Sequence, residues 1–210
     1  MHHSEQLAVA LWPFGMRTVN MLAEPAGEST LTPENNGSRY EGRNREGHAA
    51  NLLGALAIAC GDLQRELLDA HGLDAGTGAA LMCVHTRAGS NIGEIGQTAD
   101  LTHSGAVRAA SRLEWLGLVR RRHGSDRRTV EVHCTRTGTT LARKLLKGRR
   151  RSLESLLEQL TTTEKDRFRV IAAKLLAGLP SDRAAAWRIC RFCDHGVCTG
   201  EDCPVGSAVP

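Results

Sequence analysis

The most constraining feature of the sequence is a helical segment followed at once by a basic β-hairpin, within residues 102–134. Thr102 is a typical N-cap residue, and the pattern after it predicts a helix from about His103 to Trp115 that ends at Gly117. The residues expected to face the interior from this helix are Ala106, Val107, Ala110 and Leu113. Small and basic residues are left for its other face.

Two short β-branched segments follow, at residues 118–122 and 129–134, and Gly124, Ser125 and Asp126 supply the turn between them. Upstream, apolar residues at steps of three and four predict a helix from Ala49 that closes near Gly72, and a second helix at about 77–86. Ser90 or Asn91 is expected to cap a short third helix. Helix, turn, helix and basic hairpin is the order of a winged helix-turn-helix, so the predicted fold is mainly α with a small β-hairpin wing.

A long helix is predicted after the hairpin, from about Arg136 to Leu160, with Thr135 as its cap. At about 1.5 Å per residue it reaches nearly 40 Å, which is longer than one small domain needs. Thr161 and Glu164 form a capping-box signature that opens a last helix. We therefore expect a helical dimerisation region that packs on a second copy of the chain.

Three regions are predicted along the chain. Residues 1–48 are rich in proline and polar residues and are expected to form a disordered N-terminal tail. Residues 49–180 form the winged domain with its dimerisation helices, and residues 181–210 form a short cysteine-rich tail that a metal ion stabilises. No apolar run approaches the ~20 residues of a membrane span, and no signal-peptide pattern opens the chain, so we expect a cytoplasmic protein without a membrane partner.

The basic residues are concentrated in one block. Residues 102–151 contain 14 Lys and Arg against 3 Asp and Glu, whereas the remaining 160 residues carry 13 against 20. A local net charge of +11 inside an acidic chain predicts a surface that binds polyanions. The alternative is that these charges only solvate exposed helix faces.

Three motifs follow one another in a specific order and spacing: Leu101-Thr102-x-Ser104-x-x-Val107-Arg108-x-x-x-Arg112-Leu113-Glu114-x-x-Gly117-Leu118-Val119-x-Arg121, then Asp126-Arg127-Arg128, and Thr135-x-x-Gly138. Through these motifs the region from 49 to 180 resembles the MarR family of bacterial transcriptional regulators. The resemblance implies an obligate homodimer whose paired winged domains bind double-stranded DNA at a pseudo-palindromic operator. It also implies a repressor that releases DNA when a small-molecule effector or an oxidant acts.

The predicted DNA contacts lie on the helix after Thr102 and at the wing. Arg108 and Arg112 are candidates for guanine edges or nearby phosphates, and His103 and Ser104 for a base edge or phosphate near the helix start. The resemblance places wing arginines Arg127 and Arg128 in the adjacent minor groove, with Asp126 orienting them. For Arg108 and Arg112 taken singly, the alternative is a solvated helix face. Glu114 and Trp115 are given structural roles, Glu114 in pairing with a neighbouring arginine and Trp115 in packing under the wing.

Four of the seven cysteines fall within fourteen residues in a C-x2-C-x4-C-x4-C pattern: Cys190, Cys193, Cys198 and Cys203. Since the tail has few large apolar residues, four thiolates around one structural zinc ion would supply its folding energy. An iron–sulfur cluster and a metal-free thiol switch are the alternatives, and His195 is expected to stay outside the ligand set. The other three cysteines are isolated among apolar residues.

These observations predict a dimeric, sequence-specific DNA-binding regulator with a structural zinc in its tail. The alternative is a redox or metal sensor in which the cysteine cluster controls DNA binding. An enzyme is not expected, because the sequence has no phosphate-binding loop, no HExxH motif and no serine or cysteine beside a plausible histidine partner.

Overall fold

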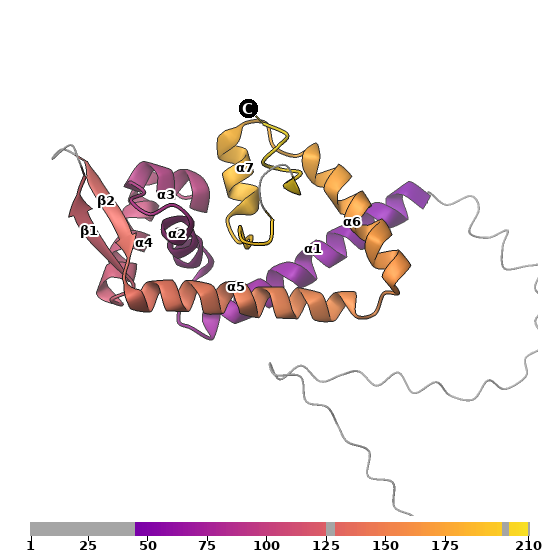
Figure 1. Cartoon of the computed structure of the whole chain (residues 1–210), viewed down its shortest axis with the longest axis horizontal. Helices are drawn as coiled ribbons and strands as arrows, with labels where there is room; N and C mark the ends of the chain where they lie inside the picture. Colours follow the sequence, from indigo (N-terminus) through magenta and orange to yellow (C-terminus); the bar gives the residue numbers. More distant parts are fainter. Residues whose placement is uncertain (1–44, 125–128, 199–201, 210) are drawn as a thin grey trace, which may run out of the picture. The chain divides into compact units, whose positions relative to one another are not determined.

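The computed structural model describes residues 45–124, 129–198 and 202–209. The chain divides into two units, Met1–Ala49 and Ala50–Pro210, and the second unit holds the described elements apart from the first turn of the opening helix. The elements in chain order are α1 (Arg45–Asp69), α2 (Ala75–Thr86), α3 (Ile92–Ala99), α4 (His103–Trp115), β1 (Val119–His123), β2 (Val130–Cys134), α5 (Arg136–Leu157), α6 (Thr162–Ala177) and α7 (Arg183–Cys190) (Figure 1).

The predicted fold class, mainly α with a small β-hairpin, is confirmed. Helices begin where the local capping chemistry places them, because a cap side chain accepts a hydrogen bond from a backbone N–H that the first helical turn leaves unsatisfied. Thr102 accepts from the N–H of Gly105, and Thr135 accepts from that of Gly138. Asn91, rather than Ser90, caps α3. The long helix α5 ends at Leu157, three residues before the predicted end.

The two strands pair antiparallel, with Val119 opposite Cys134 and His123 opposite Val130. An isolated bridge between Ser90 and Val132 ties the hairpin to the loop between α2 and α3. Val132 is fully buried and pairs with Arg121, so the middle of the hairpin is anchored to the domain.

The main core lies where α2, α3 and α4 pack on one another and on the hairpin. Helix α2 is almost entirely buried from Thr77 to Val84, which explains why its apolar residues show no single stripe. The largest fully buried side chains of the described residues include Leu81, Met82, Ile95 and Leu113.

Helices α1 and α6 keep large apolar side chains on their surfaces. In α6 Val170 and Ile171 are 63% and 58% exposed, and in α1 Ile58 is 68% exposed. The other exposed members of this set are Leu52, Leu53, Leu56, Phe168 and Leu175, and Leu179 is exposed just after α6. Among the described residues, no helix combines the length and the apolar character that a membrane crossing needs.

Candidate nucleic-acid interface

Helix α4 presents a polar face to solvent at the surface of the domain. His103, Ser104, Arg108, Ser111 and Arg112 are all exposed, as the sequence predicts. Small side chains on the opposite face let the helix pack closely on α2 and α3, with Ala106 and Ala110 fully buried. The polar face is therefore held on a rigid scaffold, which is how winged domains present a helix to a major groove.

Two predictions about this helix are wrong. Val107 is 38% exposed and Ala109 takes its place in the core, because the buried face is centred between Ala106 and Leu113 and Val107 lies about 100° away from Ala106 at 3.6 residues per turn. Trp115 does not pack under the wing but is 81% exposed. It follows Ala106 by nine residues, which places it about 180° around the helix, on the same side as Arg108. Helical spacing alone would have placed Trp115 on the outward face.

Arg112 is exposed but has a partner within the chain. Its guanidinium donates a hydrogen bond to the backbone carbonyl of Gly72, 3.0 Å away, in the turn that follows α1. Gly72 has a positive φ of 69°, a conformation that glycine adopts without steric cost. This contact ties the C-terminal half of α4 to the end of α1.

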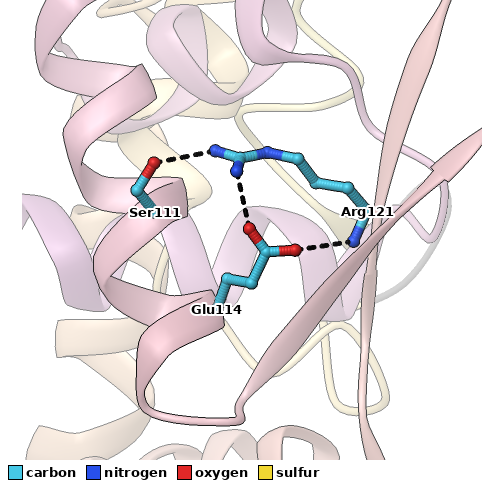
Figure 2. A network of polar contacts seen from close by, with 3 residues as sticks. All are labelled: Ser111, Glu114 and Arg121. Carbon is cyan, nitrogen blue, oxygen red and sulfur yellow. Dashed lines mark hydrogen bonds and ion pairs between the residues drawn. The ribbon is translucent and has the colours of Figure 1, made fainter.

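A network of polar contacts joins α4 to the first strand of the wing (Figure 2). The Arg121 guanidinium lies 2.6 Å from the Glu114 carboxylate and donates a second hydrogen bond to the Ser111 hydroxyl at 2.9 Å. The other Glu114 oxygen accepts from the Arg121 backbone N–H at 3.3 Å. The predicted pairing of Glu114 with a neighbouring arginine is confirmed, and it fixes β1 relative to α4.

The strand β1 carries two further arginines that are not among the predicted DNA contacts. Arg120 and Arg122 are exposed, whereas Arg121 between them is half-buried. The period of two in a strand puts Arg120 and Arg122 on one face, so alternation was the signal that could have identified them. The predicted wing residues Asp126, Arg127 and Arg128 lie outside the described residues.

The tail docks on the helix-turn-helix through α7, which packs on α3. The Arg87 guanidinium lies over the Trp187 ring, 4.5 Å from its centroid, and also donates to the hydroxyl of Thr98 in α3. Phe192 packs against the main core. Trp187 therefore lies against the main body, as the sequence predicts.

The four tail cysteines lie near one another. The thiol of Cys190 interacts with those of Cys193 and Cys203, and burial together with these neighbouring thiols raises the pKa of Cys190 to about 12. Burial and a hydrogen bond with Cys203 raise the pKa of Cys198 to about 11. Burial acts to raise the pKa of Cys203, but hydrogen bonds from the Gly206 backbone N–H and from neighbouring thiols outweigh it and lower that pKa below its usual value.

Across the described ranges, no group of three or more His, Cys, Asp or Glu side chains has the arrangement of a metal site. Residues Thr199, Gly200 and Glu201, which connect Cys198 to the last cysteine, lie outside these ranges. The zinc site expected from the sequence therefore stays a prediction.

Known proteins similar to this chain are transcriptional regulators. The chain is 30% identical over 99 residues to the HTH-type transcriptional regulator YwhA of Bacillus subtilis, a match that covers 47% of this chain and 71% of the relative. It is 29% identical over 119 residues to the transcriptional repressor MprA of Escherichia coli, covering 55% and 68%. A MarR-family transcriptional regulator from Silicibacter pomeroyi superposes with a TM-score of 0.51 at 27% identity, covering 65% of this chain and 92% of that structure. No protein-family model matches the sequence. These relatives are regulators and not enzymes, in agreement with the sequence prediction.

Proposed function

Because this chain belongs to the MarR family of winged-helix transcriptional regulators, we propose that it is a repressor that binds a pseudo-palindromic operator as a homodimer. The observation that carries the proposal is the polar face of α4, with Arg108 exposed at its centre and the wing fixed beside it by the Glu114–Arg121 pair. The likeness to a relative named as a repressor supports repression rather than activation.

The chemistry of this face suits a major groove. An arginine on a helix that enters the groove pairs bidentately with guanine O6 and N7, and each such pair contributes ~1–3 kcal/mol of discrimination. His103 and Ser104 lie in the first turn of α4, where side chains and backbone N–H groups reach base edges or phosphates. Arg120 and Arg122 are exposed on the wing strand, and we expect them to contact the phosphate backbone.

The homodimer is supported by the apolar surfaces of α1 and α6. Ile58 of α1, Val170 of α6 and Leu179, two residues after α6, are each more than 60% exposed in the single chain. Apolar surface of this extent favours burial against a partner. A second copy related by a two-fold axis presents the same surfaces, so the contact is self-complementary. Two copies of α4 would then contact half-sites about one helical turn, roughly 34–36 Å, apart.

The test combines oligomeric mass with DNA binding. The purified chain is expected to have the mass of a dimer by light scattering and to bind a promoter fragment from its own genomic neighbourhood better than unrelated DNA. Replacing Arg108 with Ala should weaken that specific binding by about 5- to 150-fold, the range that ~1–3 kcal/mol gives, and should reduce the preference for the operator.

Arg65→Ala is the matched control, because it removes the same charge from an exposed side chain on α1 that is paired with Asp62. We expect it to leave operator affinity unchanged within about two-fold. A monomeric protein, or equal affinities of the Arg108 and Arg65 variants, would contradict the proposal. The small-molecule effector that the family resemblance implies stays a prediction.

A further inference from the structure

The strongest cluster of reactive side chains outside the DNA-binding face is the set of four cysteines in the tail. Cys190 ends α7 and is buried, and Cys193, Cys198 and Cys203 are half-buried beside it. Cys193 and Cys203 pack with Cys190 in one small cluster. A hydrogen bond with Cys203 contributes to the raised pKa of Cys198. Cys203 is thus the common neighbour of a cysteine on the helix and a cysteine in the following turns.

We propose that Cys190, Cys193, Cys198 and Cys203 bind one Zn²⁺ ion as a closed four-thiolate site, and that this ion holds the tail against α3. Four soft sulfur donors without an open position are the ligand set of a structural zinc site. With Zn–S bonds of about 2.3 Å, tetrahedral geometry brings the sulfurs to roughly 3.8 Å from one another. Among the described residues the four thiols do not have this arrangement, so their side chains rotate toward the ion when it binds.

The backbone around the cluster favours thiolates. The N–H of Gly206 donates a hydrogen bond to the Cys203 sulfur at 3.2 Å, and the N–H of Cys193 donates to the Cys190 carbonyl at 2.9 Å, which closes a turn between the first two cysteines. Backbone N–H donors to sulfur are a recurrent way for proteins to stabilise metal-bound thiolates. A side chain at position 206 would press on the Cys203 sulfur, since a Cβ there would lie 3.3 Å from it.

Two other potential ligands nearby are engaged elsewhere. The His195 ring stacks on Trp187 with centroids 5.8 Å apart. The Asp194 carboxylate lies 3.6 Å from Arg150 of α5 and accepts a hydrogen bond from the Gly196 N–H. Asp202 is exposed beside Cys198. The four cysteine sulfurs are soft donors, which select zinc over magnesium or calcium.

Apolar packing gives the tail little support of its own. Its small core consists of Ala186, Cys190, Val205 and Val209, with Leu176 and Ile189 packed against it. Two valines and two small residues cannot offset the conformational entropy lost when an irregular segment of this length is ordered. A metal ion that crosslinks the end of α7 to the segment after it supplies the missing constraint, because metal binding and folding are coupled in such segments.

The position of the cluster connects it to the DNA-binding face. Helix α7 packs on α3, the first helix of the helix-turn-helix, and Arg87 bridges the two by contacting Trp187 and the Thr98 hydroxyl. The consequence for DNA binding rests on the proposed function. Loss of zinc should loosen α7 and remove a support of α3, and therefore lower operator affinity.

The test uses the full-length chain and measures metal directly. Wild-type protein and the control Cys60→Ser are expected to contain one zinc per chain, released by a mercurial reagent, whereas Cys193→Ser and Cys203→Ser should retain less than one tenth of it. Because a cysteine variant can misfold, Co²⁺ is titrated into metal-free wild-type protein, and visible bands of a tetrahedral cobalt–thiolate site should saturate at one equivalent. Full zinc occupancy in the cysteine variants, no saturable cobalt binding, or iron with visible absorption would each overturn the site.

A second arm tests the link to α3. Removal of zinc from wild-type protein with a chelator should weaken binding to a promoter fragment at least 10-fold, and zinc should restore it. Unchanged affinity after verified metal loss would overturn the link and leave the metal site standing. Failure to bind DNA in either metal state would instead count against the proposed function, while the zinc and cobalt measurements would still decide the site.

Discussion

Gly138 is the residue where a single methyl group should do the most damage to the wing. It lies in the first turn of α5, and its N–H donates to the Thr135 hydroxyl that caps the helix. A Cβ at this position would overlap the backbone carbonyl oxygen of Leu118 and lie 2.8 Å from the carbonyl carbon. Because these atoms belong to the backbone, they cannot rotate away, and α5 would have to move relative to the start of β1.

The size of the effect follows from three contributions. Alanine in a helix is favoured over glycine by ~1 kcal/mol, and overpacking costs ~1–3 kcal/mol. The Leu118 carbonyl accepts hydrogen bonds from the Thr135 N–H at 2.9 Å and from the Thr135 hydroxyl at 3.2 Å, and weakening them costs about 1 kcal/mol more. The net prediction for Gly138→Ala is a loss of about 2 kcal/mol in the free energy of unfolding, or a fall in Tm of about 4–8 °C.

Gly148→Ala provides the control within the same helix. Its Cβ would lie 2.9 Å from a terminal methyl group of Leu67, which is the flexible end of a side chain and can rotate. The gain in helix propensity should roughly balance that adjustment, so Tm should change by less than about 3 °C. Thermal unfolding followed by circular dichroism measures both variants, and a Gly138 variant as stable as the Gly148 variant would refute the reasoning.

Three further substitutions test other parts of the molecule. Glu114→Gln removes the charge that pairs with Arg121 and should reduce stability by less than ~1 kcal/mol, because the pair is partly exposed, but should lower operator affinity several-fold by releasing the wing. Leu175→Glu places a charge on the apolar face of α6 and should convert the dimer to a monomer in light scattering, whereas Lys174→Glu should not. Burial, and then the nearby positive charge of Arg143, lower the pKa of His85 from its usual 6.5. The unfolded chain therefore takes up more protons at acid pH, so stability should fall as pH drops below about 6.5, and His85→Asn should reduce that fall in urea titrations.

Each of these three predictions has an outcome that would contradict it. If Glu114→Gln binds the operator as tightly as wild type, the Glu114–Arg121 pair does not position the wing. A dimeric Leu175 variant would place the interface elsewhere than α6. An unchanged pH profile for the His85 variant would mean that another group carries the acid sensitivity.

The helix starts could be predicted from the sequence because their signals are local. Thr102, Thr135 and Thr161 each cap a helix with a contact to a residue three positions later, so the information lies within one turn. The hairpin was predicted for the same reason, from two β-branched segments around a turn. The capping box at Thr161 and Glu164 is confirmed with both reciprocal hydrogen bonds present.

Long-range contacts could not be predicted in this way. The hydrogen bond from Arg112 to Gly72 joins residues 40 positions apart, and the contact of Arg87 with Trp187 joins two helices that no local pattern connects. The sequence predicts Val107 on the inward face of α4, but Ala109 is buried in its place. A small residue such as Ala109 gives a weak apolar signal, and the packing of α2 and α3 on α4 decides which residues are covered.

The arginines of the basic block differ in whether they have a partner within the chain. Only those without one are available to contact DNA. The sequence assigns the block a net charge of +11, but Arg121 is paired with Glu114 and Arg112 donates to a backbone carbonyl. Arg108, Arg120 and Arg122 are exposed, so a duplex on this face would meet these charges. Since the role of an arginine is set by the acceptor it reaches, a sequence can predict that a surface binds a polyanion while leaving open which of its arginines contact the polyanion and which hold the surface in place.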